Sequence, residues 1–241
     1  MNKNYFSVPS RLYKLISKRG FYSIFIRLAK VLSRKGIYEF LSAEYSNITE
    51  GSKVLSIGAG GEINSILMEH RTDNGFDVIT IDIDENRNPD IVGDVCTCDF
   101  GDMLFDVIIM GEVLEHLHSP HLAIDNIASA LKPGGKLVIT VPFMFPIHER
   151  PHDYYRYTRY GLQYILKEFD SVQIKERNGW AEAINVLFVR LVMEKSTSAR
   201  IAAPVFLLVA FINVPIMLLL SKLIKTDFIT SGYLISARKP G

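Results

Sequence analysis

The chain has 241 residues, of which 48% are hydrophobic and 22% charged, and this balance excludes intrinsic disorder as the main state. Its two cysteines, Cys96 and Cys98, are separated by one residue, which excludes a disulfide framework and favours a reducing compartment such as the cytoplasm. The formal net charge of +1 hides an asymmetry: residues 1–36 carry nine of the 27 Lys and Arg and no acid, so 18 basic residues face all 26 acids in the remainder.

Residues 1–50 are predicted to form a basic, amphipathic helical extension. Between Phe21 and Lys35, apolar residues recur every three or four positions, with Arg and Lys between them. Two interpretations stay open: a helix lying in the interface of an anionic membrane, or a helix packed on the protein's own sheet with a solvated basic rim. Nothing beyond charge favours nucleic acid, so no nucleic-acid partner is expected.

Residues 51–182 are predicted to form an α/β core. Short β-rich runs without clean alternation follow one another with helical segments between them, which is typical of a parallel sheet covered on both faces. Repeated βα units imply right-handed crossovers and an open doubly wound sheet. The expected strands are Lys53–Ile57, Val78–Ile81, Asp90–Val92, Phe105–Met110, Lys136–Pro142 and Ser171–Arg177, and the expected helices lie near Ile63–Arg71, Pro120–Leu131 and Thr158–Phe169.

A hydrophobic helical insertion is expected over residues 183–228, before a final strand of the core within residues 229–241. Ile201–Leu220 is twenty residues without a charge, which is long enough to span a membrane. If Gly232–Arg238 rejoins the sheet, a single crossing is excluded, because the strand would lose its backbone partners. The insertion is then a re-entrant hairpin, a second crossing after Ala183–Met193, or a buried cap or oligomer interface. We favour attachment to one membrane face.

A glycine turn follows the first strand of the core. Gly58 to Gly61 let the backbone turn sharply and approach a ligand closely. The next strand ends at Asp82, 24 positions after Gly58, where an acid in a doubly wound sheet faces the ribose of a nucleotide-like ligand, and Asp94 follows the next strand. Ile63 stands where a dinucleotide fingerprint needs a small residue, so a ligand without a pyrophosphate suits the turn better.

Five strings occur in order: VLSIGAGGE, VITIDID, IVGDV, FDVIIMGEVLEHL and LKPGGKLVITVPF. With them the sequence resembles the class I S-adenosylmethionine-dependent methyltransferases, in particular the type 11 and ubiquinone O-methyltransferase-like group. The resemblance implies a Rossmann-like, seven-stranded sheet with an antiparallel last strand, and S-adenosylmethionine as the cofactor. The cofactor contacts that it implies are Ser56, Gly58, Ala59, Gly60, Gly61, Asp82, Ile83, Asp94, Val95 and Met110.

A second group of candidates is expected to carry the chemistry. If a helix begins after the fourth strand, Glu112, Glu115 and His116 share one face at the carboxyl edge of the sheet, and the loop holding His152 overhangs the same edge. Similar strings bind a metal in ubiquinone-biosynthesis and small-RNA 2′-O-methyltransferases, so the resemblance implies Mg²⁺ held by these four residues. Alternatively, the acids serve the helix dipole, or His152 is a general base without metal. The candidate catalytic residues are His152, Glu112 and His116.

The sequence therefore predicts an S-adenosylmethionine-dependent methyltransferase. The expected reaction is O-methylation of a lipid-like or lipid-linked (glycan or prenyl) acceptor by an enzyme held peripherally or monotopically at the cytoplasmic face of the inner membrane. Two alternatives stay open: a soluble small-molecule methyltransferase whose insertion is a dimer interface, and a non-catalytic protein that binds S-adenosylmethionine.

Overall fold

The computed structural model describes residues 21–191 and 197–241, with the backbone alone for residues 21–32, 35, 197 and 200. The part of the predicted basic arm that precedes residue 21 lies outside the described residues.

A seven-stranded sheet with the order β3-β2-β1-β4-β5-β7-β6 forms the centre of the molecule. The strands from β1 to β5 run parallel, and β7 lies antiparallel between β5 and β6. This topology confirms the predicted fold class. The strands are β1 (Lys53–Ile57), β2 (Asp77–Asp82), β3 (Ile91–Val92), β4 (Phe105–Gly111), β5 (Leu131–Pro142), β6 (Asp170–Glu176) and β7 (Gly232–Arg238).

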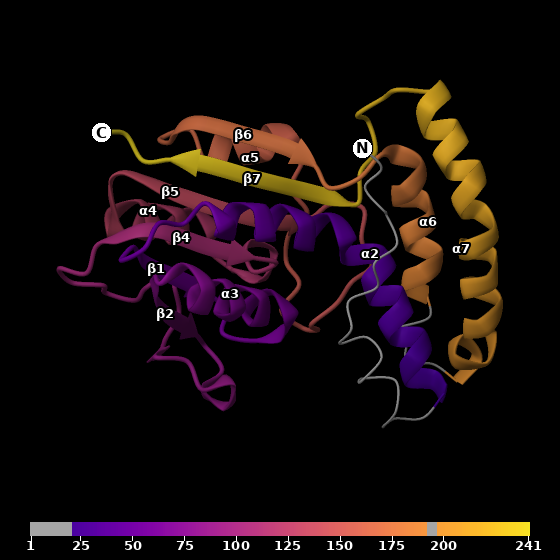
Figure 1. Ribbon diagram of the computed structural model, residues 1–241, viewed down its shortest axis with the longest axis horizontal. Helices are drawn as coiled ribbons and strands as arrows, with labels where there is room; N and C mark the ends of the chain where they lie inside the picture. The colour runs from indigo at the N-terminus through magenta and orange to yellow at the C-terminus, as the bar shows by residue number, and fades with distance from the viewer. Residues whose placement is uncertain (1–20, 192–196) are drawn as a thin grey trace.

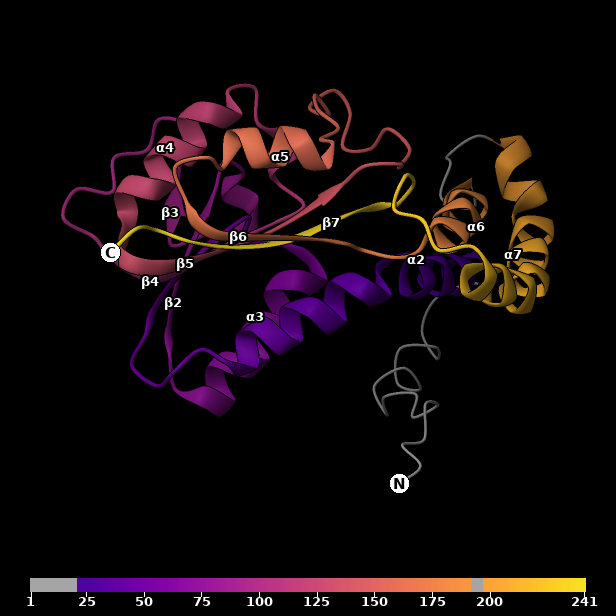
Figure 2. The ribbon, with the colours of Figure 1, turned by 90° about the horizontal axis from the view of Figure 1, so that it is seen from above.

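Helices cover both faces of the sheet, as Figure 2 shows, because the central strands are apolar on both sides. On one face lie α2 (Phe21–Ser46) and α3 (Gly61–Asn74), and on the other lie α4 (Pro120–Ala130) and α5 (Arg159–Ile165). Two short 3-10 helices, η1 (Glu85–Arg87) and η2 (Leu114–His116), follow β2 and β4. Each face has its own hydrophobic cluster.

The second half of α2 belongs to the core and is not a separate extension. Its residues Ile37, Leu41 and Tyr45 are fully buried against the sheet and α3. Their spacing of four residues places them on one helix face, and burial of that face holds the helix in place. For this half of the helix, the interpretation of packing on the protein's own sheet is therefore correct.

The insertion forms a helical hairpin of α6 (Trp180–Leu191) and α7 (Thr197–Leu223), so it begins slightly earlier than expected. Figure 1 shows the hairpin beyond the end of the sheet where β7 begins, beside the first half of α2. Trp180 Nε1 donates a hydrogen bond of 2.9 Å to the Ile224 carbonyl, which closes the open end of the hairpin. The chain then returns to the sheet, because Gly232 pairs with Pro142.

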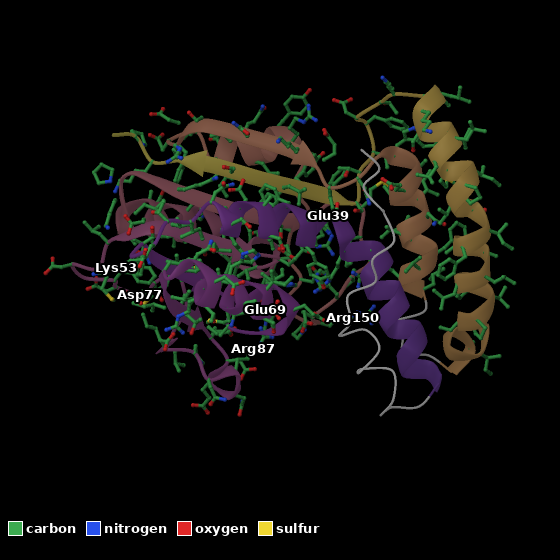
Figure 3. The ribbon with its side chains drawn as sticks, viewed as in Figure 1. Glu39, Lys53, Glu69, Asp77, Arg87 and Arg150 are labelled. Carbon is green, nitrogen blue, oxygen red and sulfur yellow. The ribbon has the colours of Figure 1, made fainter. Side chains whose placement is uncertain are left out.

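The opposite edge of the sheet, where the parallel strands begin, is polar. Lys53 and Asp77 begin β1 and β2 and are register partners there, as Figure 3 shows. The hairpin and the amino edge are therefore at opposite ends of the strands, and the carboxyl ends of the parallel strands point toward the hairpin.

Candidate active site

A cavity of about 890 Å³ lies at the carboxyl edge of the parallel strands. Open α/β sheets bind their ligands at this edge, where the strand order reverses on either side of β1. The ends of β1, β2 and β4 and the segments that follow β1 to β5 form its wall: they include Ser56, Gly58, Gly60, Gly61, Asp82, Ile83, Asp94, Val95, Gly111, Glu112, His116, His148, Glu149 and His152, with Arg34 from α2.

The glycine turn forms one wall of this cavity. Gly58 and Gly61 have φ angles of 94° and 78°, which favour glycine. The Gly58 amide donates a hydrogen bond of 2.8 Å to the Ile81 carbonyl, which draws the turn onto the end of β2. A Cβ at Gly58 would lie 3.0 Å from Val113 Cγ2, so glycine also leaves room for the segment after β4.

Asp82 is buried at the end of β2 and already organises the turn. Its Oδ2 accepts a hydrogen bond of 2.8 Å from the Ala59 amide, and its Oδ1 accepts one of 2.9 Å from the Asp84 amide. Arg87 Nη1 lies 3.3 Å from Oδ2. Figure 3 labels Arg87 on the loop after β2. Sequence reasoning missed this arginine, although its position three residues after Asp84 in a short turn was a signal.

Asp94 lines the same cavity as the glycine turn. Its Oδ1 accepts a hydrogen bond of 2.8 Å from the Cys96 amide, and His118 Nε2 lies 3.4 Å from Oδ2. Of the ten predicted cofactor residues, only Ala59 and Met110 do not line the cavity. Met110 is fully buried within the sheet, and its neighbour Gly111 reaches the wall instead.

No helix begins at Glu112. The expected arrangement of Glu112, Glu115 and His116 on one helix face is therefore wrong. The Glu112 amide still donates to the Thr140 carbonyl, at 2.9 Å, so β4 extends its pairing with β5 by one residue. Glu112 then turns the chain with a φ of 56°, and η2 begins only at Leu114. Glu112, Glu115 and His116 therefore do not share a helix face.

The Glu112 side chain forms a buried ion pair with Arg177. Its Oε1 also accepts a hydrogen bond of 3.1 Å from Thr140 Oγ1. Burial raises the pKa of Glu112, but the charges of Arg177 and Arg34 outweigh it and lower the pKa overall. Glu112 is thus a carboxylate that lines the cavity and is paired with an arginine, and it is not part of the group of Glu115, His116 and His148.

Glu115, His116 and His148 come together beside the cavity, and the two histidines line it. Glu115 is fully buried, and neither carboxylate oxygen has a hydrogen-bond partner among the described residues. The Nε2 atoms of both histidines lie 3.6 Å from Glu115 Oε1. Burial raises the pKa of Glu115. The ligand atoms of the three residues all lie within 4.8 Å of one another.

His148, and not the predicted His152, is the histidine that joins this group. The His152 ring is exposed, and its Nδ1 lies 3.0 Å from the Tyr154 hydroxyl. The loop contributes the His152 backbone instead, because His116 Nδ1 lies 2.6 Å from the His152 carbonyl oxygen. His148 and His152 both lie in the short loop after β5, and only the path of that loop decides which ring turns inward.

A second layer holds His148 in place. Asp153 Oδ2 accepts a hydrogen bond of 2.9 Å from the His148 amide and lies 3.4 Å from its Nδ1. Arg156 donates to both oxygens of Asp153, at 2.6 and 2.7 Å. Burial raises the pKa of Asp153, but these hydrogen bonds outweigh it and lower the pKa to about 2. A charged Asp153, held by Arg156, therefore fixes the backbone of His148 and lies beside its ring.

Residues 27–189 match the family model described as a methyltransferase domain, which is more than half of the chain. The chain belongs to this methyltransferase family. The predicted class I S-adenosylmethionine-dependent methyltransferase family is thereby confirmed.

Curated relatives of the methyltransferase domain include a demethylmenaquinone methyltransferase of Renibacterium salmoninarum, 32% identical over 99 residues, which are 37% of this chain and 40% of that protein. A ubiquinone biosynthesis O-methyltransferase of Coxiella burnetii is 32% identical over 87 residues, which are 33% of this chain and 35% of that protein. The chain thus spans less than half the length of the curated relatives that it matches.

Solved structures show the same fold as the methyltransferase domain. A phosphoethanolamine N-methyltransferase of Haemonchus contortus, in complex with phosphomonomethylethanolamine and S-adenosylhomocysteine, has a TM-score of 0.58 at 15% identity over 97% of this chain and 61% of that chain. An S-adenosylmethionine-dependent methyltransferase of Archaeoglobus fulgidus has a TM-score of 0.57 at 18% identity over 91% of this chain and 100% of that chain.

Proposed function

We propose that this chain transfers a methyl group from S-adenosylmethionine to an acceptor bound at the same cavity. The observation that carries the proposal is the alignment, along one cavity wall, of the glycine turn, Asp82 and Asp94. In this proposal the turn borders the methionine part, Asp82 binds the ribose hydroxyls, and Asp94 with the Val95 backbone holds the adenine. Met110 contributes only as packing beneath the site.

The reaction is an in-line displacement, in which the acceptor oxygen attacks the methyl carbon and the carbon–sulfur bond breaks. The sulfonium is a good leaving group, so the protein must align the acceptor and take its proton. His152 lines the cavity with an exposed ring, and we assign to it the role of general base. His116, on the same wall, helps to position the acceptor hydroxyl.

A divalent ion is a second way to activate the acceptor hydroxyl. Glu115, His116 and His148 fit one, because a buried carboxylate without a hydrogen-bond partner among the described residues faces two imidazoles. Two imidazoles and one carboxylate favour Mn²⁺ or Zn²⁺ over the Mg²⁺ that the sequence suggested. When bound, such an ion would lower the pKa of the acceptor hydroxyl.

The metal proposal is tested by dialysis against a chelator. We expect the chelated protein to bind S-adenosylhomocysteine unchanged, and added Mn²⁺ to raise the melting temperature of the wild type but not of His148→Gln. Equal responses of wild type and variant would remove the metal proposal and leave His152 as the base.

The acceptor is proposed to be lipid-like or lipid-linked and to be methylated on oxygen at the cytoplasmic membrane face. Ile201–Leu223 is long and apolar enough to cross a membrane, and only 17% of it is buried. A core helix of a soluble protein would be mostly buried, so this exposed apolar surface favours contact with a membrane or another protein. The names of the curated relatives, which refer to demethylmenaquinone and ubiquinone, are compatible with a quinone-related acceptor.

Cofactor binding is tested by calorimetry with S-adenosylhomocysteine and with NAD. We expect S-adenosylhomocysteine to bind the wild type more tightly than NAD does, and Asp82→Ala to weaken it by about tenfold or more, since charge-assisted hydrogen bonds are lost. Asp77→Ala, an exposed change at the other end of β2, should leave binding unchanged. Tighter binding of NAD would overturn the proposed cofactor.

Membrane association is tested by flotation with anionic lipid vesicles. We expect the full chain to float and a variant with Ile212→Glu and Leu219→Glu to remain in the aqueous fraction, because both side chains are more than half exposed on α7. Leu122→Glu, an exposed apolar position on α4, is the matched control and should still float. A wild type that stays in solution as a dimer would instead make α7 an oligomer interface.

A further inference from the structure

Three arginines gather between the cofactor cavity and the helical hairpin. Arg34 comes from α2, Arg177 from the end of β6, and Arg190 from α6. Arg177 and Arg190 are buried, with 5% and 8% of their surfaces exposed, and Arg34 is largely buried. Three guanidinium groups from elements that are distant in sequence thus share one small region, which we call the arginine cluster.

The buried carboxylate of this region is Glu112, which already pairs with Arg177. Arg177 Nε and Nη1 and Arg34 Nε are buried and have no hydrogen-bond partner among the described residues. Glu62 lies 3.6 Å from Arg34, but its side chain is about half exposed. Buried donors of a charged group are costly to leave unpaired, so these nitrogens point to an anionic group that would accept from them.

Arg190 lies beside an aromatic ring and close enough to the other two arginines to feel their charge. Its guanidinium carbon lies 4.3 Å from the centre of the Phe145 ring. Burial and the nearby charge of Arg34 lower the pKa of Arg190 to about 10, although Glu112 opposes the change. Burial and neighbouring cations disfavour the charged guanidinium, and an anion bound in the arginine cluster would favour it.

The position of the arginine cluster connects it to the proposed reaction. Arg34 and Glu112 line the cavity, whereas the acids that are expected to bind the nucleoside, Asp82 and Asp94, belong to the loops after β2 and β3. The hairpin that carries Arg190 also carries the exposed apolar surface of α7. A molecule with an apolar part on α7 would therefore bring its polar part past Arg190 and Arg34 on the way to the methyl donor.

We propose that the arginine cluster binds a phosphate or pyrophosphate group of the methyl acceptor. The inference rests on the proposed function and narrows its substrate to a phosphorylated acceptor. Arginine suits this role, since its planar fork matches phosphate oxygens and stays charged on burial better than lysine does. The same chemistry recognises a lipid-linked pyrophosphate and a soluble phosphate ester.

The test uses the full chain saturated with S-adenosylhomocysteine and inorganic pyrophosphate as the probe. Calorimetry at constant ionic strength should detect pyrophosphate binding to the wild type. Arg34→Gln and Arg190→Gln should each weaken it by about tenfold or more, the effect of losing a charge-assisted hydrogen bond. Arg71→Gln, an exposed arginine on α3, is the control and should leave it unchanged.

A second arm distinguishes the two sources of phosphate. Vesicles of phosphatidylcholine with added phosphatidic acid should compete with pyrophosphate if the acceptor is a lipid, whereas plain phosphatidylcholine should not. Competition by neither, with pyrophosphate binding intact, indicates a soluble phosphate ester.

The outcomes separate the inference from the function on which it rests. A wild type that binds S-adenosylhomocysteine but not pyrophosphate, or variants that bind pyrophosphate like the wild type, would overturn the inference alone. Failure to bind S-adenosylhomocysteine would overturn the proposed function. If Arg190→Gln does not fold, Arg34→Gln decides, because its side chain is partly exposed at the cavity wall.

Discussion

Single residues at the carboxyl edge of the sheet contact partners that their positions in the sequence do not indicate. Glu112 follows β4 directly, as the sequence indicated, but its carboxylate is taken by Arg177, which stands 65 positions later in the chain. Glu115 lies only three residues further on and faces His148 instead. Two neighbouring acids therefore belong to two separate clusters, one with Arg177 and one with His116 and His148.

Removal of the Glu112 charge should be costly for stability. Glu112→Gln leaves Arg177 buried without its carboxylate, and breaking a buried ion pair from one side costs about 3–5 kcal/mol of unfolding free energy. Urea denaturation measures the loss. The exposed Glu149→Gln should stay within about 0.5 kcal/mol of the wild type. A Glu112→Gln variant as stable as that control would contradict the ion pair.

The contribution of Asp153 to the free energy of unfolding should depend on pH. Its pKa in the folded state is about 2, below the value of about 3.9 in an unfolded chain. The stabilisation is therefore complete above pH of about 4 and is lost as the pH falls toward the folded-state pKa. We expect Asp153→Asn to melt at a lower temperature than the wild type at neutral pH, and the gap to narrow on acidification. A gap of constant size would show that Asp153 acts through packing alone.

Secondary-structure elements were largely predictable from the sequence, and the exceptions have a physical cause. β1 and β7 have the predicted ends, because turn residues bound their apolar runs. The segment after β4 was predicted wrongly as a helix, since the hydrogen bond from the Glu112 amide to Thr140 continues the sheet by one residue. Such a bond depends on β5, which lies far along the chain, and local spacing cannot reveal it.

The start of α5 offers a test at this scale. Thr158 is its N-cap, and its Oγ1 accepts a hydrogen bond of 3.1 Å from the Gly161 amide. Thr158→Ala should lower the unfolding free energy by about 1 kcal/mol, whereas Thr158→Ser should retain most of it. Thermal denaturation of the two variants side by side measures the difference. Equal losses in both would assign the effect to the threonine methyl group.

At the scale of the whole molecule, the meeting of groups at the strand ends was predictable from the sequence, and the meeting of groups from the loops and the hairpin was not. The glycine turn, Asp82 and Asp94 each follow a strand directly, so the order of parallel strands brings them to one edge. His148, Arg177 and Arg190 come from a loop, a strand end and an inserted helix, whose meeting depends on tertiary packing. The sequence offered no spacing that could connect them.

The return of the chain to the sheet makes a prediction about the membrane. Because β7 pairs with β5 and β6 after α7, both ends of α7 should lie on one side of a bilayer. In a background with Cys96→Ala and Cys98→Ala, single cysteines at Ser198, Asp227 and Lys53 should all react with an impermeant reagent from the same side of vesicles. Lys53 marks the side of the core. Reaction of Ser198→Cys from the opposite side would mean that α7 crosses.

The helix α2 is continuous from Phe21 to Ser46, which at 1.5 Å per residue makes it about 39 Å long. Its second half packs between the sheet and α3, and its first half lies beside the hairpin, so one helix connects the two parts of the molecule. A hairpin packed on a continuous helix cannot rotate independently of the core. Whatever surface the hairpin settles on, the mouth of the cavity keeps one fixed tilt toward it.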